Sequence, residues 1–75
     1  MSNQQQDALI PIVINGEARQ VPAGLNIRNL VAHLGLDPAR VAVELNRRLV
    51  RKHEWDATAV ESGAVLEIVT FVGGG

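Results

Sequence analysis

Cysteine is absent from the sequence, and its absence excludes several kinds of chemistry. A chain without thiols forms no disulfide, carries no thiolate nucleophile and builds no cysteine-based zinc site. Because such a chain suits a reducing compartment, we expect a cytoplasmic protein.

An excess of one charge and long apolar runs are also lacking. The 7 basic and 8 acidic side chains give a formal net charge of -1, so bulk charge does not favour nucleic acid as a partner. Apolar runs stop after a few residues, far short of the roughly 20 needed to cross a membrane. Met1 to Ala8 contain no lysine or arginine and thus lack a secretion signal. We expect a soluble protein that binds neither nucleic acid nor membrane.

The length of 75 residues allows one small domain. At this size folding buries roughly 60% of the surface of the unfolded chain, so we expect a thin core without a large internal pocket. Residues 1–8 are predicted to be a disordered lead-in, residues 9–72 the domain, and residues 73–75 a flexible glycine tail.

The domain is predicted to begin with a β-hairpin. Ile10 to Ile14 is a β-rich run, and the following Asn15-Gly16 is typical of a two-residue hairpin turn. Glu17 to Val21 forms the second, more polar arm. Pro11 has no N–H to donate, so it is expected at a strand start or at a sheet edge.

One amphipathic helix of about ten residues should follow. Asn26 is a good N-cap, and Leu25 can pack against Leu30 across it. Gly35 suits the left-handed C-cap position, and Pro38 prevents continuation. Apolar residues recur at helical spacing: Ile27, Leu30, Val31 and Leu34.

The second half of the chain reads as strands. Val41 to Leu45 is one strand, Asn46-Arg47-Arg48 a turn, and Leu49-Val50 a short return strand. His53 to Ala57 looks irregular, and Ser62-Gly63 is the last turn. Val65 to Val72 is the most β-prone stretch, and its nearly continuous apolarity predicts a central strand covered on both faces or nearly so.

This order of elements predicts an α+β domain with a β-grasp (ubiquitin-like) fold, in which one helix packs across a mixed sheet of four to five strands. A ferredoxin-like split arrangement is the alternative. It requires a second helix, and the segment from Lys52 to Glu61 is too short and too broken to supply one.

Three glycines, Gly73 to Gly75, end the sequence directly after the last strand. Glycine loses the most backbone entropy on ordering and offers a sheet nothing to pack, so a fold has little use for it there. A chain end without Cβ atoms can instead thread a narrow channel and deliver the carboxylate of Gly75 into another protein's active site. The alternative interpretation is that the three glycines are only a frayed chain end without a function.

A carboxylate becomes reactive when its oxygen is made a leaving group, as in adenylation by ATP on an external enzyme. Attack by a persulfide sulfur then yields a terminal thiocarboxylate, a soft nucleophile that can donate sulfur. The chain itself needs no cysteine for this, because the sulfur arrives from outside.

The segment from Val41-Ala-Val-Glu-Leu-Asn-Arg through Glu54-Trp55 to Leu66-Glu-Ile-Val-Thr-Phe-Val-Gly-Gly-Gly75 closely resembles the ThiS-type sulfur carriers of thiamine biosynthesis. Asn15-Gly16-Glu17 and Leu34-Gly35 match the family in order and spacing. Met1 to Ala8 lies outside the resemblance. Carriers of molybdopterin synthesis share the fold and the terminal Gly-Gly pair, and the motif with Glu54-Trp55 favours the thiamine branch.

The resemblance implies a carrier rather than an enzyme, with no cofactor of its own. An adenylyltransferase related to ubiquitin-activating enzymes would consume ATP to activate the chain, and a donor such as a cysteine desulfurase persulfide would supply sulfur to thiazole synthase through it. Gly75 would carry the covalent thiocarboxylate, and Gly74 is the other member of the family's glycine pair. Gly73 is an additional glycine. Transient binding to each enzyme favours a free monomer.

Phe71 and Val72 stand where the last strand meets the tail. Strand alternation places them on opposite faces, so one of them should be exposed as a partner contact.

Other polar and aromatic residues have more ordinary interpretations. His33 and His53 come from distant segments without matching carboxylates, so no metal site is expected. The basic cluster Arg47, Arg48, Arg51 and Lys52 is interpreted as a solvated hairpin. Trp55 is expected to anchor its loop to the core.

Two further functions remain open from the sequence. A ubiquitin-like modifier would share the activation step but be joined to lysines. A β-grasp interaction module would bind partners through its surfaces and make no use of the tail.

Overall fold

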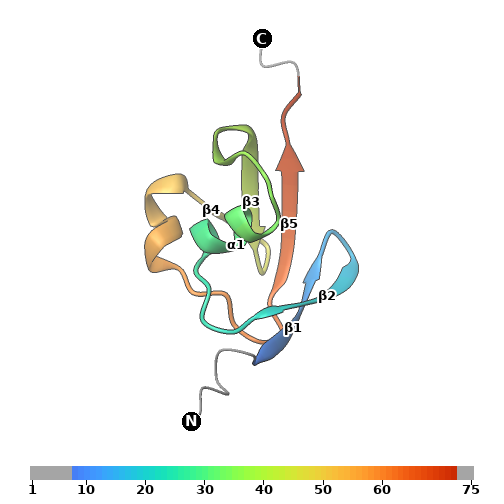
Figure 1. Ribbon diagram of the computed structural model, residues 1–75. Coiled ribbons are helices and arrows are strands. Elements are labelled where there is room, and N and C mark those ends of the chain that lie inside the picture. Colours follow the sequence, from blue (N-terminus) through green and yellow to red (C-terminus); the bar gives the residue numbers. More distant parts are fainter. Residues whose placement is uncertain (1–7, 73–75) are drawn as a thin grey trace.

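Residues 8–72, which are those the computed structural model describes, form a five-stranded sheet with one α-helix across one of its faces (Figure 1). The strand order is β2-β1-β5-β3-β4. β1 and β5 pair in parallel, whereas the other neighbours pair antiparallel. The predicted α+β mixed sheet with one crossing helix is therefore confirmed. The elements are β1 (Leu9–Ile14), β2 (Glu17–Pro22), α1 (Ile27–His33), the 3-10 helix η2 (Pro38–Arg40), β3 (Val41–Leu45), β4 (Arg48–Val50), the 3-10 helix η3 (Lys52–Ala57) and β5 (Val65–Thr70).

The first hairpin turns at Asn15-Gly16, as predicted. Both residues have positive φ, 51° and 83°, which is the backbone that a two-residue turn with right-handed strand twist requires. Pro11 pairs with Gln20 on β2, and within residues 8–72 β1 meets β5 only at Val13 and beyond. The missing N–H of Pro11 thus falls where β1 has one strand neighbour.

Helix α1 has the predicted caps. The side-chain oxygen of Asn26 accepts a hydrogen bond of 2.7 Å from the Asn29 N–H. At the other end Gly35 (φ 74°) donates to the Ala32 carbonyl, and Leu36 donates to the Val31 carbonyl, the bond pattern of a Schellman motif. With seven residues, α1 is shorter than the expected ten, because Leu34 already serves as its C-cap.

The prediction that His53 to Ala57 is irregular is wrong, because these residues belong to the 3-10 helix η3. The Glu54 carboxylate accepts a 3.0 Å hydrogen bond from the Arg51 N–H and starts the helix. Trp55 is fully buried and donates its indole N–H to the Val50 carbonyl at 3.0 Å. The preceding turn also proves one residue shorter than predicted, since Arg48 already lies in β4.

The hydrophobic core lies between α1, η3 and one face of the sheet (Figure 1). Trp55 anchors η3 in it, as predicted. β1, β3 and β5 contribute alternate residues, as the two-residue period of a strand requires, whereas β2 and β4 contribute one buried residue each. Its buried members are Ile12, Ile14, Val21, Ile27, Leu30, Val31, Val41, Val43, Val50, Trp55, Val60, Ala64, Leu66 and Ile68.

The last strand departs from prediction in its coverage. β5 is the middle strand of the sheet, but it is covered on one face, and Val65 and Val69 are 46% and 56% exposed. The prediction of two covered faces is wrong because, within residues 8–72, α1 and η3 pack against the same side and no second layer covers the other. No helix in this part of the chain is long and apolar enough to span a membrane.

Candidate functional site

Gly73, Gly74 and Gly75, the predicted site, lie outside the described residues, and the structure describes the strand that precedes them. β5 is paired on one side with β3 from Leu66 to Thr70 and on the other with the end of β1. Beyond the strand, the Phe71 N–H donates to the Arg40 carbonyl at 2.7 Å. The backbone is therefore held as far as Phe71.

Asn15 extends the pairing of β5 beyond the reach of β1. The side-chain amide of Asn15 donates to the Ile68 carbonyl at 3.1 Å, and its oxygen accepts from the Ile68 N–H at 2.8 Å. These two bonds reproduce what a neighbouring strand would offer. Asn15 thereby secures the half of β5 that leads to the tail.

Asn46 plays a similar part at the start of β5. Its backbone N–H donates to the Val65 carbonyl at 2.7 Å, and its side-chain oxygen accepts from the Val65 N–H at 3.1 Å. Asn15 and Asn46 both begin hairpin turns with positive φ. Sequence reasoning identified the turns but missed the contacts, because Asn-Gly and Asn-Arg signal only the local backbone.

Phe71 and Val72 are both exposed, at 51% and 87%. The prediction asked for one exposed residue, and both are exposed because β5 ends at Thr70 and the core ends with it. Their predicted role as partner contacts is compatible with this exposure and stays a prediction.

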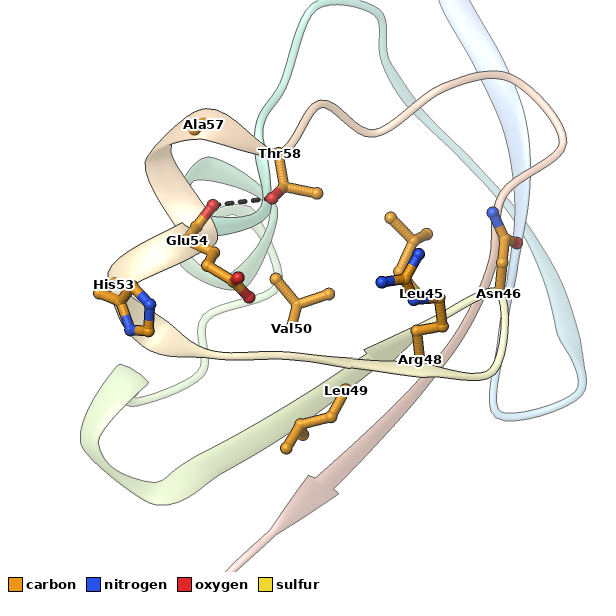
Figure 2. A pocket seen from close by; sticks show the side chains of 9 residues that line it. All are labelled: Leu45, Asn46, Arg48, Leu49, Val50, His53, Glu54, Ala57 and Thr58. Atoms are coloured by element: carbon orange, nitrogen blue, oxygen red, sulfur yellow. Dashed lines mark hydrogen bonds between the residues drawn. The ribbon is translucent and has the colours of Figure 1, made fainter.

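A hollow of about 670 Å³ lies between β4 and η3 (Figure 2). Its polar contacts serve the local fold: the Thr58 hydroxyl donates to the Glu54 carbonyl at 2.7 Å, and the Glu54 carboxylate caps η3. The lining residues are Leu45, Asn46, Arg48, Leu49, Val50, His53, Glu54, Ala57 and Thr58. His53 and Thr58 both line the hollow, but the Thr58 hydroxyl is bonded to the Glu54 carbonyl, and no hydrogen bond joins it to His53 within the described residues.

The two histidines are exposed on separate helices, His33 at the end of α1 and His53 in η3. Within residues 8–72 no three histidine or carboxylate side chains gather in a way that would hold a metal ion.

The basic cluster Arg47, Arg48, Arg51 and Lys52 is exposed, as its interpretation as a solvated hairpin requires. Its member Lys52 also lies over the Trp55 ring, 5.8 Å from the centroid, and Arg28 of α1 lies at 5.5 Å. These cations tie α1 and η3 together at the border of the core.

Comparison with known proteins gives consistent matches. The ThiS family model matches residues 12–75, which include the glycine tail. The crystal structure of a thiamine biosynthesis protein (ThiS) from Geobacter metallireducens superimposes with a TM-score of 0.76 at 32% identity, covering 88% of this chain and all of that one.

Curated relatives extend this picture. A thiazole synthase of Paramagnetospirillum magneticum is 45% identical over 64 residues, which are 85% of this chain and 20% of that protein. The ycf40 protein of Porphyra purpurea is 33% identical over 88% of this chain and 93% of its own length. The chain thus spans about a fifth of the thiazole synthase that it matches and nearly all of ycf40. With the family model covering the domain and the tail, and with a solved relative of the same fold, the chain belongs to the ThiS family.

Proposed function

We propose that this chain is a sulfur carrier of thiamine biosynthesis and that the carboxylate of Gly75 is its working group. The match of the ThiS family model to residues 12–75 carries the proposal, because it includes both the sheet and the terminal glycines. The chain would act as a cytoplasmic co-substrate of other enzymes, without a catalytic centre or cofactor of its own.

The proposed chemistry has three steps at Gly75. On an adenylyltransferase, a carboxylate oxygen attacks the α-phosphorus of ATP, pyrophosphate leaves, and an acyl adenylate forms. The terminal sulfur of a donor persulfide then attacks the acyl carbon and AMP leaves. A second thiol breaks the sulfur–sulfur bond, takes the donor sulfur into a disulfide and releases the thiocarboxylate.

The partners follow from this chemistry and from the relatives. The segment 45% identical to this chain within a thiazole synthase supports that enzyme as the acceptor of sulfur. The adenylyltransferase and a donor such as a cysteine desulfurase persulfide are required by the chemistry of the steps.

The geometry of β5 supports delivery of a tail. The strand is held by β1, β3, Asn15 and Asn46, while Phe71 and Val72 project beyond the core. A rigid strand that ends in exposed residues lets a partner bind the domain and the following glycines together, and preorganisation lowers the entropy lost on binding.

Intact-protein mass spectrometry tests the proposal. The chain is incubated with ATP, the adenylyltransferase of the same organism and a persulfide donor. We expect a mass increase equal to replacing one oxygen by sulfur, localised to Gly75 by fragmentation. The variant lacking Gly74 and Gly75 should show no change, whereas a control lacking Met1 and Ser2 should react like the full chain.

Two outcomes would contradict the proposal. Higher-mass conjugates on lysines of other proteins, without thiocarboxylate, would identify a ubiquitin-like modifier. Absence of both adenylate and thiocarboxylate, while the same enzyme activates a known carrier, would favour an interaction module.

A further inference from the structure

The sheet face opposite α1 carries a continuous set of aligned side chains. Strand register places Ala42 opposite Val69, and Glu44 between Glu67 on β5 and Leu49 on β4. Val13 pairs with Val65 on the other side of β5. We call the set Val13, Ala42, Glu44, Leu49, Val65, Glu67 and Val69 the open-face patch.

The patch is mostly apolar and open to solvent. Leu49, Val65 and Val69 are 54%, 46% and 56% exposed. Phe71, beyond the end of β5, lines one hollow together with Ala42 and Leu49. Exposed apolar side chains that gather on one face mark a contact surface, whereas scattered ones do not. The patch also runs along β5 toward the residues that precede the glycine tail.

Two carboxylates stand in the middle of this apolar surface. Glu44 and Glu67 are directly opposite each other on antiparallel strands and are both exposed. In such a pair the Cβ atoms lie about 5 Å apart, and like charges at that separation destabilise the sheet. Neither glutamate belongs to an ion pair formed within residues 8–72.

Cations border the open-face patch but do not belong to it. The other positions of the patch are uncharged. Arg48 alternates with Leu49 and so points to the helix side of the sheet. Arg51 and Lys52 line the same hollow as Ala42 and Leu49 and therefore border the patch. Neither of these two cations forms an ion pair with Glu44 or Glu67 in the described part of the chain, so the two carboxylates remain available to a partner.

We propose that the open-face patch is the docking surface for thiazole synthase, and that arginine or lysine side chains of the synthase bind between Glu44 and Glu67. This inference rests on the proposed function. The centre of a protein interface is depleted of charge, so two facing carboxylates suit an interface only where the partner supplies the opposite charge. A relative named thiazole synthase contains a segment 45% identical to this chain, which favours the synthase as the occupant.

The pair then has opposite effects in the free and bound states. In the free domain the two charges repel, and in the complex they are bridged by a cation. Replacing both should therefore stabilise the free domain and weaken the complex, which a purely structural role would not produce.

The experiment compares two charge-matched double variants of the full chain. Glu44→Gln with Glu67→Gln removes the pair. Glu17→Gln with Glu61→Gln removes two exposed carboxylates outside the patch, at the start of β2 and in the loop before β5. The affinity for the thiazole synthase of the same organism is measured by calorimetry at low and high salt, and the Tm of each free chain is measured by scanning.

For the open-face variant we expect the Kd for the synthase to rise about 10-fold or more, with a weaker salt dependence. Its Tm should rise by about 2–4 °C, since each kcal/mol shifts the Tm of so small a domain by several degrees. The control variant should change Kd by less than about 2-fold. A third variant, Val69→Ser, keeps the charges and should also weaken binding.

Equal affinity of the wild type and the open-face variant for the synthase would overturn the inference. Failure of the wild-type chain to bind the synthase would also overturn it. Thiocarboxylate formation at Gly75, followed by mass spectrometry, is read separately. If the thiocarboxylate forms but the affinity for the synthase does not depend on Glu44 and Glu67, the proposed docking surface is wrong and the carrier chemistry stands. If the thiocarboxylate does not form, the proposed function itself fails.

Discussion

The two faces of the central strand β5 carry similar aliphatic side chains, but those on one face are buried and those on the other are exposed. On the helix side Leu66 and Ile68 are 0% and 7% exposed, whereas on the open face Val65 and Val69 are about half exposed. An aliphatic strand therefore does not reveal by itself how many of its faces are covered. One face supplies the core, and the other is available for contact.

The two faces also differ in their polar residues. Glu44 and Glu67 lie on the open face, whereas the helix side of the same strands is lined by core side chains. The helix side of the sheet thus carries the core, and the open face carries the proposed docking surface. Substitutions on the two faces should consequently affect different measurements.

The largest difference in the free energy of unfolding is expected between side-chain truncations at two adjacent positions of β5. Leu66→Ala removes a fully buried side chain and should lower the free energy of unfolding by about 2–5 kcal/mol. Val65→Ala removes a half-exposed one and should cost less than about 1 kcal/mol. Urea denaturation of both variants measures this difference, and equal losses would mean that the two faces are not separate in energy.

Removal of the Asn15 amide should have the next largest effect. Asn15→Gly keeps the positive φ but loses both bonds to Ile68, and should cost about 1–3 kcal/mol. Asn15→Asp retains the acceptor and loses the donor, so its cost should lie between those of wild type and Asn15→Gly. Denaturation gives the energies, and amide hydrogen exchange at Ile68 shows whether β5 is loosened; unchanged exchange in Asn15→Gly would argue against the clamp.

Asn46→Gly provides a matched comparison, because it loses one side-chain bond, to the Val65 N–H. Its cost should be about half that of Asn15→Gly, roughly 1 kcal/mol. The faster exchange should appear at Val65 and leave Ile68 protected. A larger cost than that of Asn15→Gly would reverse the proposed ranking of the two contacts.

The smallest effect is expected at the border of the helix side. Arg28 makes an exposed ion pair with Asp56 and lies over Trp55, so Arg28→Gln should cost less than about 1 kcal/mol. Arg48→Gln removes a cation without such contacts and should be neutral within about 0.5 kcal/mol. A Tm scan at low and high salt compares the two, and a larger loss for Arg48 would contradict the assignment.

Much of the fold was predictable because its signals are local. Asn15-Gly16 indicated the hairpin, Asn26 and Gly35 the helix ends, and Val41–Leu45 a strand with the observed bounds. Turn and cap preferences depend on a residue's own backbone and near neighbours. The candidate tail was likewise predicted from its glycines, taken together with the strand before them and the order of elements.

The predictions failed where the local structure depends on contacts between residues far apart in the chain. The 3-10 helix η3 forms around Trp55, whose burial depends on the assembled core. The bonds of Asn15 to Ile68 join residues 53 positions apart, and no local pattern signals them. Coverage of β5 depends on where α1 packs.

The amino-acid sequence by itself determined the turns, the caps, the strand segments, the absence of thiols and the glycine ending, since each follows from residue chemistry and short-range backbone geometry. Tertiary structure alone decided which face of β5 is covered, which asparagines hold the strand, and that Glu44 and Glu67 face each other. The physical reason is that strand register and packing bring together residues far apart in the chain, and their energies depend on that pairing.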